Sequence, residues 1–400
     1  MNQPSYSKTL NQLSFEDTKI AFSSKSDFKL SKSYWIFAAM NQIWIVKLGT
    51  FFIKLLLFLH FPIKKLIKST LFEQFCGGES IEECKKIIAE LQQGKIGTIL
   101  DYSVEGEESE KSFQKTKSEI LETIRKAHQE SAIPFAVFKM TGIFQVELLE
   151  EFQTENGLTE DNVTSFQHSK DLLLEICQLA ADLHVKLFID AEESWIQNTI
   201  DVLAYEMMEK FNAQEAIIFN TFQMYRVDML ANLTQAITNA ETKHYHLGVK
   251  LVRGAYLEKE RQRAHEDEYS EPLHKEKAAT DHDFNEGMLL CLNHIDSVNF
   301  CIGTHNESSC IQLTQAMQKA QISNNHPHVY FAQLLGMSDN ISYNLADAGY
   351  NVAKYVPYGP IEAVMPYLFR RADENSSIAG QTSREFTLLQ KEVRRRKTAQ

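Results

Sequence analysis

Short apolar runs of strand length alternate with longer amphipathic stretches along most of this 400-residue chain. The apolar runs predict β-strands at residues 98–102, 133–139, 185–190, 216–220, 248–253, 298–302, 329–332 and 352–356. The stretches between them predict helices at residues 81–91, 118–130, 172–183, 196–211, 225–240, 285–294, 307–320 and 341–348. Because the runs are apolar throughout, both faces of each strand are expected to be buried, as in a parallel sheet.

Eight strands that alternate with helices are the count of a (β/α)8 barrel, and we predict this α/β fold, a TIM-type barrel with an N-terminal helical arm. An open doubly wound sheet is the alternative. No G-x-G-x-x-G motif follows the first predicted strand, and the chain contains no G-x-x-x-x-G-K-[ST] motif. Rossmann-type dinucleotide sites and P-loop sites are therefore disfavoured.

Two segments stand outside this alternation. Residues 1–32 are polar and rich in serine and lysine, so we expect them to be poorly ordered. Residues 140–168 form the longest interruption between predicted strands and include a helix-like piece at residues 146–152. Long interruptions often have a function, and this one is a candidate cover for an active site.

Composition narrows the class of protein. Apolar residues make up 44% of the chain and charged residues 24%, as in ordinary soluble globular proteins. The six cysteines show neither C-x-x-C nor zinc-ligand spacing, which indicates reduced thiols and an intracellular protein. The formal net charge of −12 argues against nucleic acid as the main partner.

The charge is unevenly distributed. Residues 1–75 carry 10 lysines and 4 acidic residues, whereas the rest of the chain carries 31 basic and 49 acidic residues. This basic arm contains the most apolar stretch of the chain, residues 43–61, which is about long enough to cross a bilayer. Lys47 and Lys54 interrupt the stretch, which disfavours a span. A helical arm packed on the domain and an interfacial helix on anionic lipid both stay open, with residues 34–68 as the candidate membrane contact.

Polar residues close nearly every apolar run. Lys139, Asp190 and Asn220 end the second, third and fourth predicted strands. The polar residues of the later strands are Arg253 and Tyr256 with Gly254 and Ala255 between them, Thr304, His305 and Asn306, Gln333, and Tyr355. Because (β/α)8 barrels carry their chemistry at the carboxyl ends of the strands, we expect these side chains to meet in one site. For any single one, a role as helix cap or surface residue is the alternative.

The last helical segment carries a sharper signal. Arg370 and Glu374 are four residues apart and share a helix face. Arg370 and Arg371 are adjacent and lie beside aromatic residues, so they could clamp a small carboxylate, which guanidinium groups bind bidentately. A solvated basic helix end, favoured by the helix dipole, is the alternative.

Other polar clusters carry no chemistry in this interpretation. The pairs His244 with His246 and His326 with His328 lack a third ligand at metal spacing, so no metal site is expected. The three arginines at residues 394–396 are expected to form a solvated tail. No G-x-S-x-G motif of a serine nucleophile is present.

Several segments resemble the proline dehydrogenase family. They are KLVRGAYLEKER (250–261), IDAEE (189–193), IFNTFQ (218–223), GTHN (303–306), LLGMSDN (334–340) and YVPYGPIEAVMPYLFRRADEN (355–375). The resemblance covers roughly residues 70–390 and is closest to the single-function, eukaryotic-like branch rather than to the bifunctional bacterial fusion. It implies an FAD-dependent flavoprotein with a distorted (β/α)8 barrel whose last helix sits over the flavin.

The resemblance also implies an activity. L-proline would be oxidised to Δ1-pyrroline-5-carboxylate by transfer of a hydride from C5 to flavin N5, the first step of proline catabolism to glutamate. The electrons would pass to a membrane quinone, which would give the basic arm a purpose. A hydroxyproline dehydrogenase of the same fold and a catalytically silent membrane-associated scaffold are the alternatives.

Roles for individual residues follow from the same resemblance. Arg370 and Arg371 would bind the substrate carboxylate, with Lys139 near it and Glu374 paired with one of the two arginines. Asp190 would organise this cationic site as a catalytic residue. The residues that would pack against the pyrrolidine ring are Tyr256, Tyr355 and Leu334.

The flavin would meet a second set of residues. Lys250 would approach the flavin as a catalytic residue, in the place of an arginine of the bacterial fusion branch. Asn220 would stand where that branch has glutamine. The other residues that would hold FAD are Val252, Arg253, Gly254, Ala255, Thr304, His305 and Glu374.

The expected organisation is an arm at residues 1–75, a flavin-binding barrel domain at residues 76–390 and a basic tail at residues 391–400. The expected location is cytoplasmic, with peripheral contact on the inner face of the cytoplasmic membrane left open.

Overall fold

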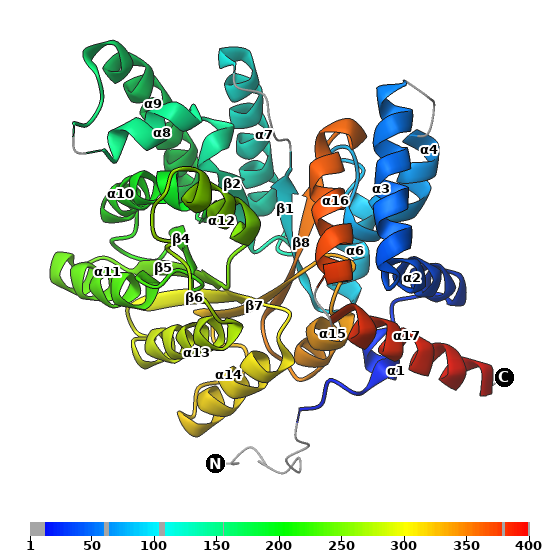
Figure 1. The fold of residues 1–400 in the computed structure, drawn as a ribbon. Helices are drawn as coiled ribbons and strands as arrows, with labels where there is room; N and C mark the ends of the chain where they lie inside the picture. The colour runs from blue at the N-terminus through cyan, green and yellow to red at the C-terminus, as the bar shows by residue number, and fades with distance from the viewer. Residues whose placement is uncertain (1–12, 60–63, 104–108, 155, 378–380, 399–400) are drawn as a thin grey trace, which may run out of the picture.

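The structure is a computed structural model that describes residues 13–59, 64–103, 109–154, 156–377 and 381–398, with side chains at all of these except 43, 54–58, 373–377 and 381–383. Eight parallel strands form a closed barrel in sequential order (Figure 1). The strands are β1 (Gly97–Tyr102), β2 (Phe135–Lys139), β3 (Lys186–Asp190), β4 (Ile218–Gln223), β5 (Leu247–Val252), β6 (Val298–Gly303), β7 (Val329–Leu334) and β8 (Val352–Tyr358). β8 pairs with β1 and closes the barrel, which confirms the predicted fold and excludes an open sheet.

Helices surround the barrel. They are α6 (Lys85–Gln93), α7 (Glu110–Gln129), α8 (Val146–Phe152), α9 (Glu160–Asp182), α10 (Ser194–Phe211), α11 (Met229–Lys243), α12 (Leu257–Glu266), α13 (Lys277–Asn293), α14 (Glu307–Lys319) and α15 (Asp339–Asp347). α8 matches the predicted helix-like piece at residues 146–152. The apolar pattern did not predict α12, because its only buried residues are Glu260 and Ala264.

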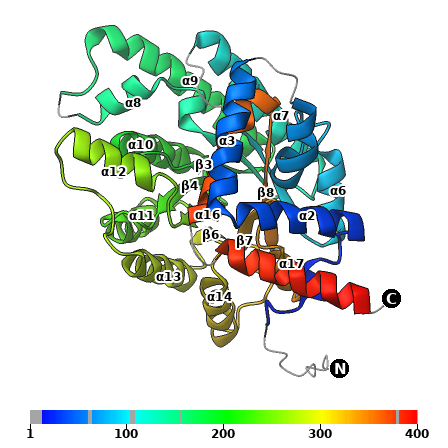
Figure 2. The same ribbon diagram turned by 45° about the vertical axis from the view of Figure 1, so that its right-hand side comes forward.

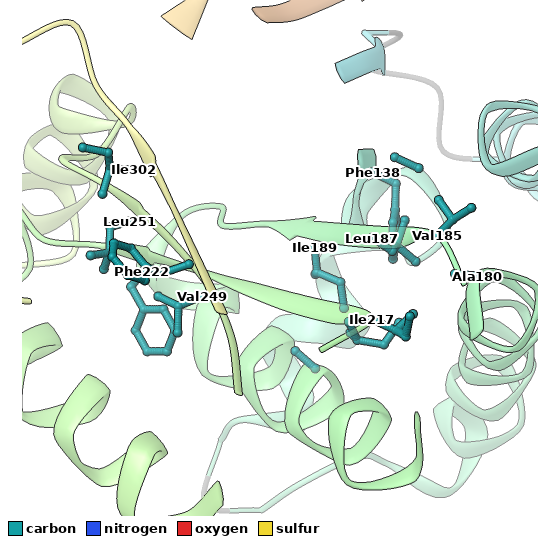
Figure 3. Close-up of a cluster of buried hydrophobic side chains, with 14 of the residues drawn as sticks. Phe138, Ala180, Val185, Leu187, Ile189, Ile217, Phe222, Val249, Leu251 and Ile302 are labelled. Atoms are coloured by element: carbon teal, nitrogen blue, oxygen red, sulfur yellow. The ribbon is translucent and has the colours of Figure 1, made fainter. Parts of the chain in front are cut away.

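Successive residues of each strand face opposite sides of the barrel wall. On β3, Leu187 and Ile189 belong to the layer between the barrel and the helices, whereas Phe188 belongs to the inner cluster. Figure 3 shows part of the outer layer, including Val249 and Leu251 of β5. Burial on both faces explains why the strands read as unbroken apolar runs.

Aromatic rings fill part of the barrel interior. The rings of Phe135 and Phe188 stack with their centroids 4.3 Å apart. Phe219 meets these two rings edge-on, at 5.6 and 5.4 Å. The interior is therefore a packed core. Its inward polar groups lie toward both ends of the strands, with Lys186 at the amino end of β3 and Asp190 at its carboxyl end.

β4 and β8 extend beyond their predicted ends. β4 continues to Gln223 and β8 to Tyr358, past the predicted ends at residues 220 and 356. In β4 the inward positions beyond Phe219 are Thr221 and Gln223, both buried. A prediction that follows the run of apolar residues ends β4 too early, because the last inward side chains of this strand are polar and lie at the mouth of the barrel.

The N-terminal arm forms a set of helices at one side of the barrel (Figures 1 and 2). Its elements are α1 (Thr18–Ala21), α2 (Asp27–Met40), α3 (Ile43–Phe58), α4 (Lys64–Ile67), the π-helical turn η1 (Lys68–Phe72) and α5 (Glu73–Phe75). The expectation of poor order for residues 1–32 is wrong for residues 13–32. Phe15, Phe22 and Leu30 are buried there, because α1 packs on α15 and α2 packs on the C-terminal helix. Residues 1–12 lie outside the described residues.

The apolar stretch of the arm forms most of α3. Within the described part of the chain, no single helix has the length and apolar character needed to cross a membrane. The segments Asp27–Met40 and Trp44–Ile53 meet that criterion only as a pair, and they are bent by 99° relative to each other. Figure 1 shows α3 running beside α16 (Ile361–Ser377), on which it packs.

The C-terminal segment is a helix rather than a solvated tail. α17 (Gln381–Thr398) runs through the predicted boundary at residue 390. Arg396 donates to Asp27 at 2.8 Å and to the backbone carbonyl of Phe22 at 2.8 Å. It also pairs at 2.8 Å with Glu392, whose side chain is fully buried. These contacts attach Arg396 to the arm, so the prediction of a solvated tail is wrong for Arg396, whereas Arg394 and Arg395 are exposed.

A buried ionic cluster joins the arm and α17 to the barrel. The Lys354 ammonium lies 3.0 Å from Asp339, and Lys25 of the arm lies 3.2 Å from the same carboxylate. Glu385 of α17 accepts a hydrogen bond from the Ser338 amide at 3.1 Å. Burial, reinforced by the negative charge of Asp339, raises the pKa of Glu385 to about 7.

Candidate active site

Polar side chains line the inner face of the barrel where the strands end. The strand alternation turns Asp101 of β1, Lys139 of β2, Asp190 of β3, Lys250 of β5 and Tyr355 of β8 inward, on the same face as the inner hydrophobic cluster. Lys139 and Asp190 are register partners on adjacent strands. Residues far apart in the sequence thus meet at the carboxyl ends of the strands, as predicted for this fold.

Three of these groups bond directly to one another. The Lys250 ammonium lies 2.5 Å from Oδ1 of Asp190 and donates to the Tyr355 hydroxyl at 2.8 Å. The Tyr355 hydroxyl donates to Oδ1 and Oδ2 of Asp190, at 2.9 and 3.1 Å. Burial and the nearby Asp190 charge hold the pKa of Tyr355 well above its ordinary value, so the phenol stays protonated and donates.

Lys250 also lies over two aromatic rings. Its ammonium is 4.4 Å from the ring centroid of Tyr355 and 5.4 Å from that of Phe188. Attraction to the ring faces and to Asp190 holds a cation in a site from which water is largely excluded.

Asp101 is a site residue that the sequence analysis missed. Burial raises its pKa, as does the nearby Asp190, while Lys139 acts in the opposite direction. Ser103 donates to its carboxylate at 2.7 Å. A polar residue near the end of an apolar run is the same signal that identified Asp190, so the first strand also carries the pattern.

Glu192 is a second missed residue. Its carboxylate accepts from the Thr141 amide at 2.9 Å and from the Thr141 hydroxyl at 2.6 Å. Burial raises the pKa of Glu192 to about 7, although the neighbouring Lys139 opposes the shift. The IDAEE segment contains this residue, but only the fold brings Glu192 close to Lys139.

Asn220 lies on the wrong side of the barrel wall for a cofactor contact. Its amide donates to Asp201 of α10 at 2.8 Å, so the side chain points to the helix layer. Gln223, three residues later, has the inward direction and donates to the backbone carbonyl of Glu192 at 2.7 Å. The predicted role of Asn220 is therefore wrong, because β4 continues past it and the alternation turns Gln223 to the mouth.

The loop after β5 is held by a guanidinium. Arg253 pairs with Asp281 at 2.7 Å and donates to Thr304 at 2.8 Å and to Ser309 at 3.0 Å. Gly254 has φ +135°, and a Cβ there would lie 2.4 Å from the ring of Tyr225. These contacts give the Val252–Ala255 backbone a fixed course beside Thr304.

Tyr256 and His305 are neutral groups at the rim. Burial raises the pKa of Tyr256, although Lys139 opposes the shift. Burial, with the charges of Lys354 and Arg371, lowers the pKa of His305 to about 3. The neutral imidazole contacts Ser338 Oγ through Nδ1 at 2.9 Å.

α16 brings the two arginines to the barrel. Arg371 is buried, and its guanidinium lies 5.1 Å from the ring centroid of Tyr367. Its charge is among the causes that lower the pKa of His305, the residue two positions after the end of β6. Arg370 is half-buried. The side chain of Glu374 lies outside the described residues.

Leu334 is an apolar residue at the mouth of the barrel, between two hydrophobic clusters. It contacts both the inner cluster of the barrel and the cluster of the arm and α16. The structure thus gathers five inward residues at the mouth of the barrel: Lys139, Asp190, Lys250, Leu334 and Tyr355.

A closed (β/α)8 barrel with buried ionisable groups at the carboxyl ends of its strands defines a TIM-barrel enzyme. Residues 84–384 match the family model described as proline dehydrogenase. The chain therefore belongs to the proline dehydrogenase family of oxidoreductases.

Individual relatives agree with this membership. Proline dehydrogenase 1, mitochondrial, of Dictyostelium discoideum is 31% identical over 98% of this chain and 77% of its own length. Hydroxyproline dehydrogenase of Xenopus laevis is 28% identical over 82% of this chain and 78% of its own length. The structure of proline utilization A from Bdellovibrio bacteriovorus, inactivated by N-propargylglycine, aligns with a TM-score of 0.72 and 20% identity. That alignment covers 93% of this chain but 40% of the longer one, and it supports the barrel fold.

Proposed function

We propose that this protein oxidises L-proline to Δ1-pyrroline-5-carboxylate with FAD as its cofactor and passes the electrons to a membrane quinone. The observation that carries the proposal is the buried cluster of Asp190, Lys250 and Tyr355 at the mouth of the barrel, with Arg371 buried near His305. Such a site offers cationic groups for a carboxylate and an anionic group for an amine, which suits a small amino acid.

The residues at the mouth fit a flavin. Gly303 ends β6 on the inner face, where an added Cβ would lie 3.0 Å from Val252 and 3.9 Å from Cε of Lys250. A side chain there would crowd Val252, so glycine lets a flat ring approach the backbone beside the Lys250 ammonium. Lys250 and Gln223 supply a cation and an amide toward that space, which suits the polar edge of a flavin. When bound, FAD would accept at N5 the hydride that leaves C5 of proline.

The rim residues would hold the rest of the cofactor. In this proposal, Arg253 keeps its loop in place through Asp281 and Ser309, and Thr304 and His305 line the approach. Val252, Gly254 and Ala255 contribute backbone groups. Glu374 keeps its proposed contact with the flavin and with the clamp. Gln223 replaces Asn220 in the proposed set.

The substrate residues have separate tasks. Arg370 and Arg371 would bind the carboxylate, with Lys139 adding positive charge. Asp190 would keep Lys250 and Tyr355 in position. Tyr256, Tyr355 and Leu334 would pack on the ring and exclude water, which favours one orientation of C5.

The overall reaction balances in electrons and protons. Proline gives up two electrons and two protons when its C5–N bond becomes a double bond. The quinone takes up two electrons and two protons and becomes the quinol. The chain itself would orient the reactants, exclude water and stabilise charge.

Hydroxyproline oxidation is the second candidate. It is favoured by the similarity to the hydroxyproline dehydrogenase of Xenopus laevis. A silent scaffold is disfavoured, because the desolvation of a buried ion pair offsets most of its attraction and such a pair adds little to stability.

Membrane contact through residues 34–68 is part of the proposal. Trp35, Trp44, Leu48, Phe51 and Phe52 are exposed on α2 and α3. Aromatic residues beside lysines suit the interface of an anionic bilayer. We therefore propose a peripheral membrane protein on the cytoplasmic side of a membrane. Its proposed organisation is an arm at residues 1–75, a catalytic domain at residues 76–390 and a C-terminal segment at residues 391–400.

Turnover of two substrates tests the function. The purified full-length protein should release FAD on denaturation and oxidise L-proline with a soluble quinone. Its kcat/KM for L-proline should exceed that for trans-4-hydroxy-L-proline by at least an order of magnitude, since a misplaced hydroxyl would be buried without a partner. The reverse preference would establish the second candidate. An FAD-loaded protein that oxidises neither substrate would refute both.

A further inference from the structure

A pocket lies between the helices of the N-terminal arm and α16, the helix that carries the two arginines. Its volume is about 590 Å³, within the usual range of small-molecule sites. α2, α3, η1 and α16 line it, mostly with aliphatic and aromatic side chains. Trp35 and Met40 of α2, Val46 and Gly49 of α3, and Phe369 of α16 are among its walls.

One wall of the pocket is shared with the active site. Phe369 and Ala372 both line the pocket. They are three residues apart, so they lie on the same face of α16. Arg371, between them in sequence, is buried close enough to His305 for its charge to lower the pKa of that imidazole. A single helix therefore borders the pocket on one face and the mouth of the barrel on another.

The outer side of the pocket opens to the surface of the arm. Phe28 and Trp35 line it while remaining 78% and 68% exposed. Trp44 and Phe51 extend the exposed apolar surface along α3. Residues 28–72 contain seven lysines and no aspartate or glutamate. Four of these lysines, Lys29, Lys32, Lys64 and Lys68, pair with Glu90, Glu73, Glu362 and Glu79. The exposed face therefore suits a bilayer chiefly through its apolar side chains, and a molecule dissolved in the bilayer could enter the pocket from it.

We propose that this pocket binds the isoprenoid tail of the lipophilic quinone, with the quinone head on the α16 side toward the barrel mouth. This inference rests on the proposed function for the nature of the electron acceptor. A quinone has one flexible hydrocarbon chain and a small neutral head, which suits an apolar pocket backed by the active-site helix. A phospholipid would have to bring a second chain and a charged headgroup that belongs at the bilayer surface.

Filling the pocket tests the proposal. A Cβ added to Gly49 meets no atom within 4 Å, so Gly49→Phe would place its ring in open space along the pocket wall. Leu48→Phe is the matched control, because Leu48 is an exposed neighbour on the same helix that does not line the pocket. For a long-tailed quinone, Gly49→Phe should raise KM on the order of tenfold, through lost burial of the tail. KM for a tailless quinone with the same head should not change, and Leu48→Phe should alter neither value.

A binding assay separates this proposal from the proposed function. The chain has three tryptophans, so Trp44→Phe with Trp195→Phe leaves Trp35 in the pocket as the sole tryptophan. The long-tailed quinone should quench Trp35 fluorescence at lower concentrations than the tailless quinone. Gly49→Phe should shift the quenching curve on the order of tenfold, and Leu48→Phe should leave it in place.

The possible results have distinct meanings. Equal quenching by both quinones, or equal KM changes for both in Gly49→Phe, would overturn the proposal. Displacement of the long-tailed quinone by a single-chain phospholipid at equal concentration would assign the pocket to lipid and also overturn it. If proline is not oxidised with any acceptor, the proposed function fails, and the quenching curves still decide whether the pocket takes the tail.

Discussion

Replacing Lys250 with methionine would leave the Asp190 carboxylate buried without its cation. The two groups are 2.5 Å apart, and their side chains are 7% and 15% exposed. The Coulomb attraction at this separation is about 6.6 kcal/mol in an effective dielectric of about 20. Desolvation of both groups offsets much of this attraction, but losing one partner of a buried pair costs about 3–5 kcal/mol. Because Tyr355 still donates to Asp190, we expect the lower end, a loss of about 3 kcal/mol in the free energy of unfolding.

A double-mutant cycle measures the pair itself. Urea unfolding followed by circular dichroism would be recorded for Lys250→Met, Asp190→Asn and the double variant. Asp190→Asn removes the orphaned charge, so the double variant should be about 2 kcal/mol more stable than the sum of the single changes implies. Lys186→Met is a matched control, since that ammonium donates to the carbonyl of Pro327 at 3.1 Å. It should lose about 1 kcal/mol.

A stability deficit of Lys250→Met below about 0.5 kcal/mol, or additive changes in the double-mutant cycle, would refute the reasoning.

Further predictions concern the substrate, the cofactor, the arm and pH. Arg370→Met and Arg371→Met should each raise KM for proline at least 30-fold with little change in FAD content, since a charged hydrogen bond to a buried carboxylate is worth about 2–5 kcal/mol; an unchanged KM in an FAD-loaded variant contradicts the clamp. FAD should co-purify, and NAD should neither bind nor accept electrons from proline, as the absorbance of NADH would report. Full-length protein should co-sediment with anionic vesicles at low salt and dissociate at high salt, each lysine near the surface contributing on the order of 1 kcal/mol; no sedimentation at low salt would exclude membrane contact. Because the folded pKa of Glu385 is about 7, above its ordinary value, this group should lower the stability by about 3 kcal/mol between pH 4.5 and pH 7. Glu385→Gln should reduce the wild-type decrease by that amount in urea titrations and leave the contribution of Glu192 in place.

Periodicity predicted the strands well because each strand is buried on both sides. An apolar run then identifies the element, and a charged residue marks its end, as Lys139 and Asp190 do in β2 and β3. The same rule misplaced the end of β4. Its inward residues at the mouth are polar, so Asn220 resembled a strand end although it contacts α10.

The sequence predicted individual residues of the candidate site but not how they are arranged. Motif resemblance named Asp190, Lys250 and Tyr355, but the distances between them depend on three strands meeting at one end of a barrel. Asp101 carried the strand-end signal but lies in none of the segments that resemble the family. Glu192 was missed because its importance comes from proximity to Lys139. A sequence does not contain that proximity until the barrel closes.

By itself, the sequence determined the eight strands, most of their flanking helices, the basic character of the arm and the residue types of the site. These are local properties, since each depends on the spacing of apolar and charged residues along a few turns or one strand. The tertiary structure alone decided which side of the wall Asn220 and Gln223 face, and that α17 returns to the arm through Arg396. It also decided that α2 and α3 bend to enclose a pocket beside α16. Such features depend on contacts between separate elements of the chain, from neighbouring strands and helices to opposite ends, and no local pattern encodes the free energy of those contacts.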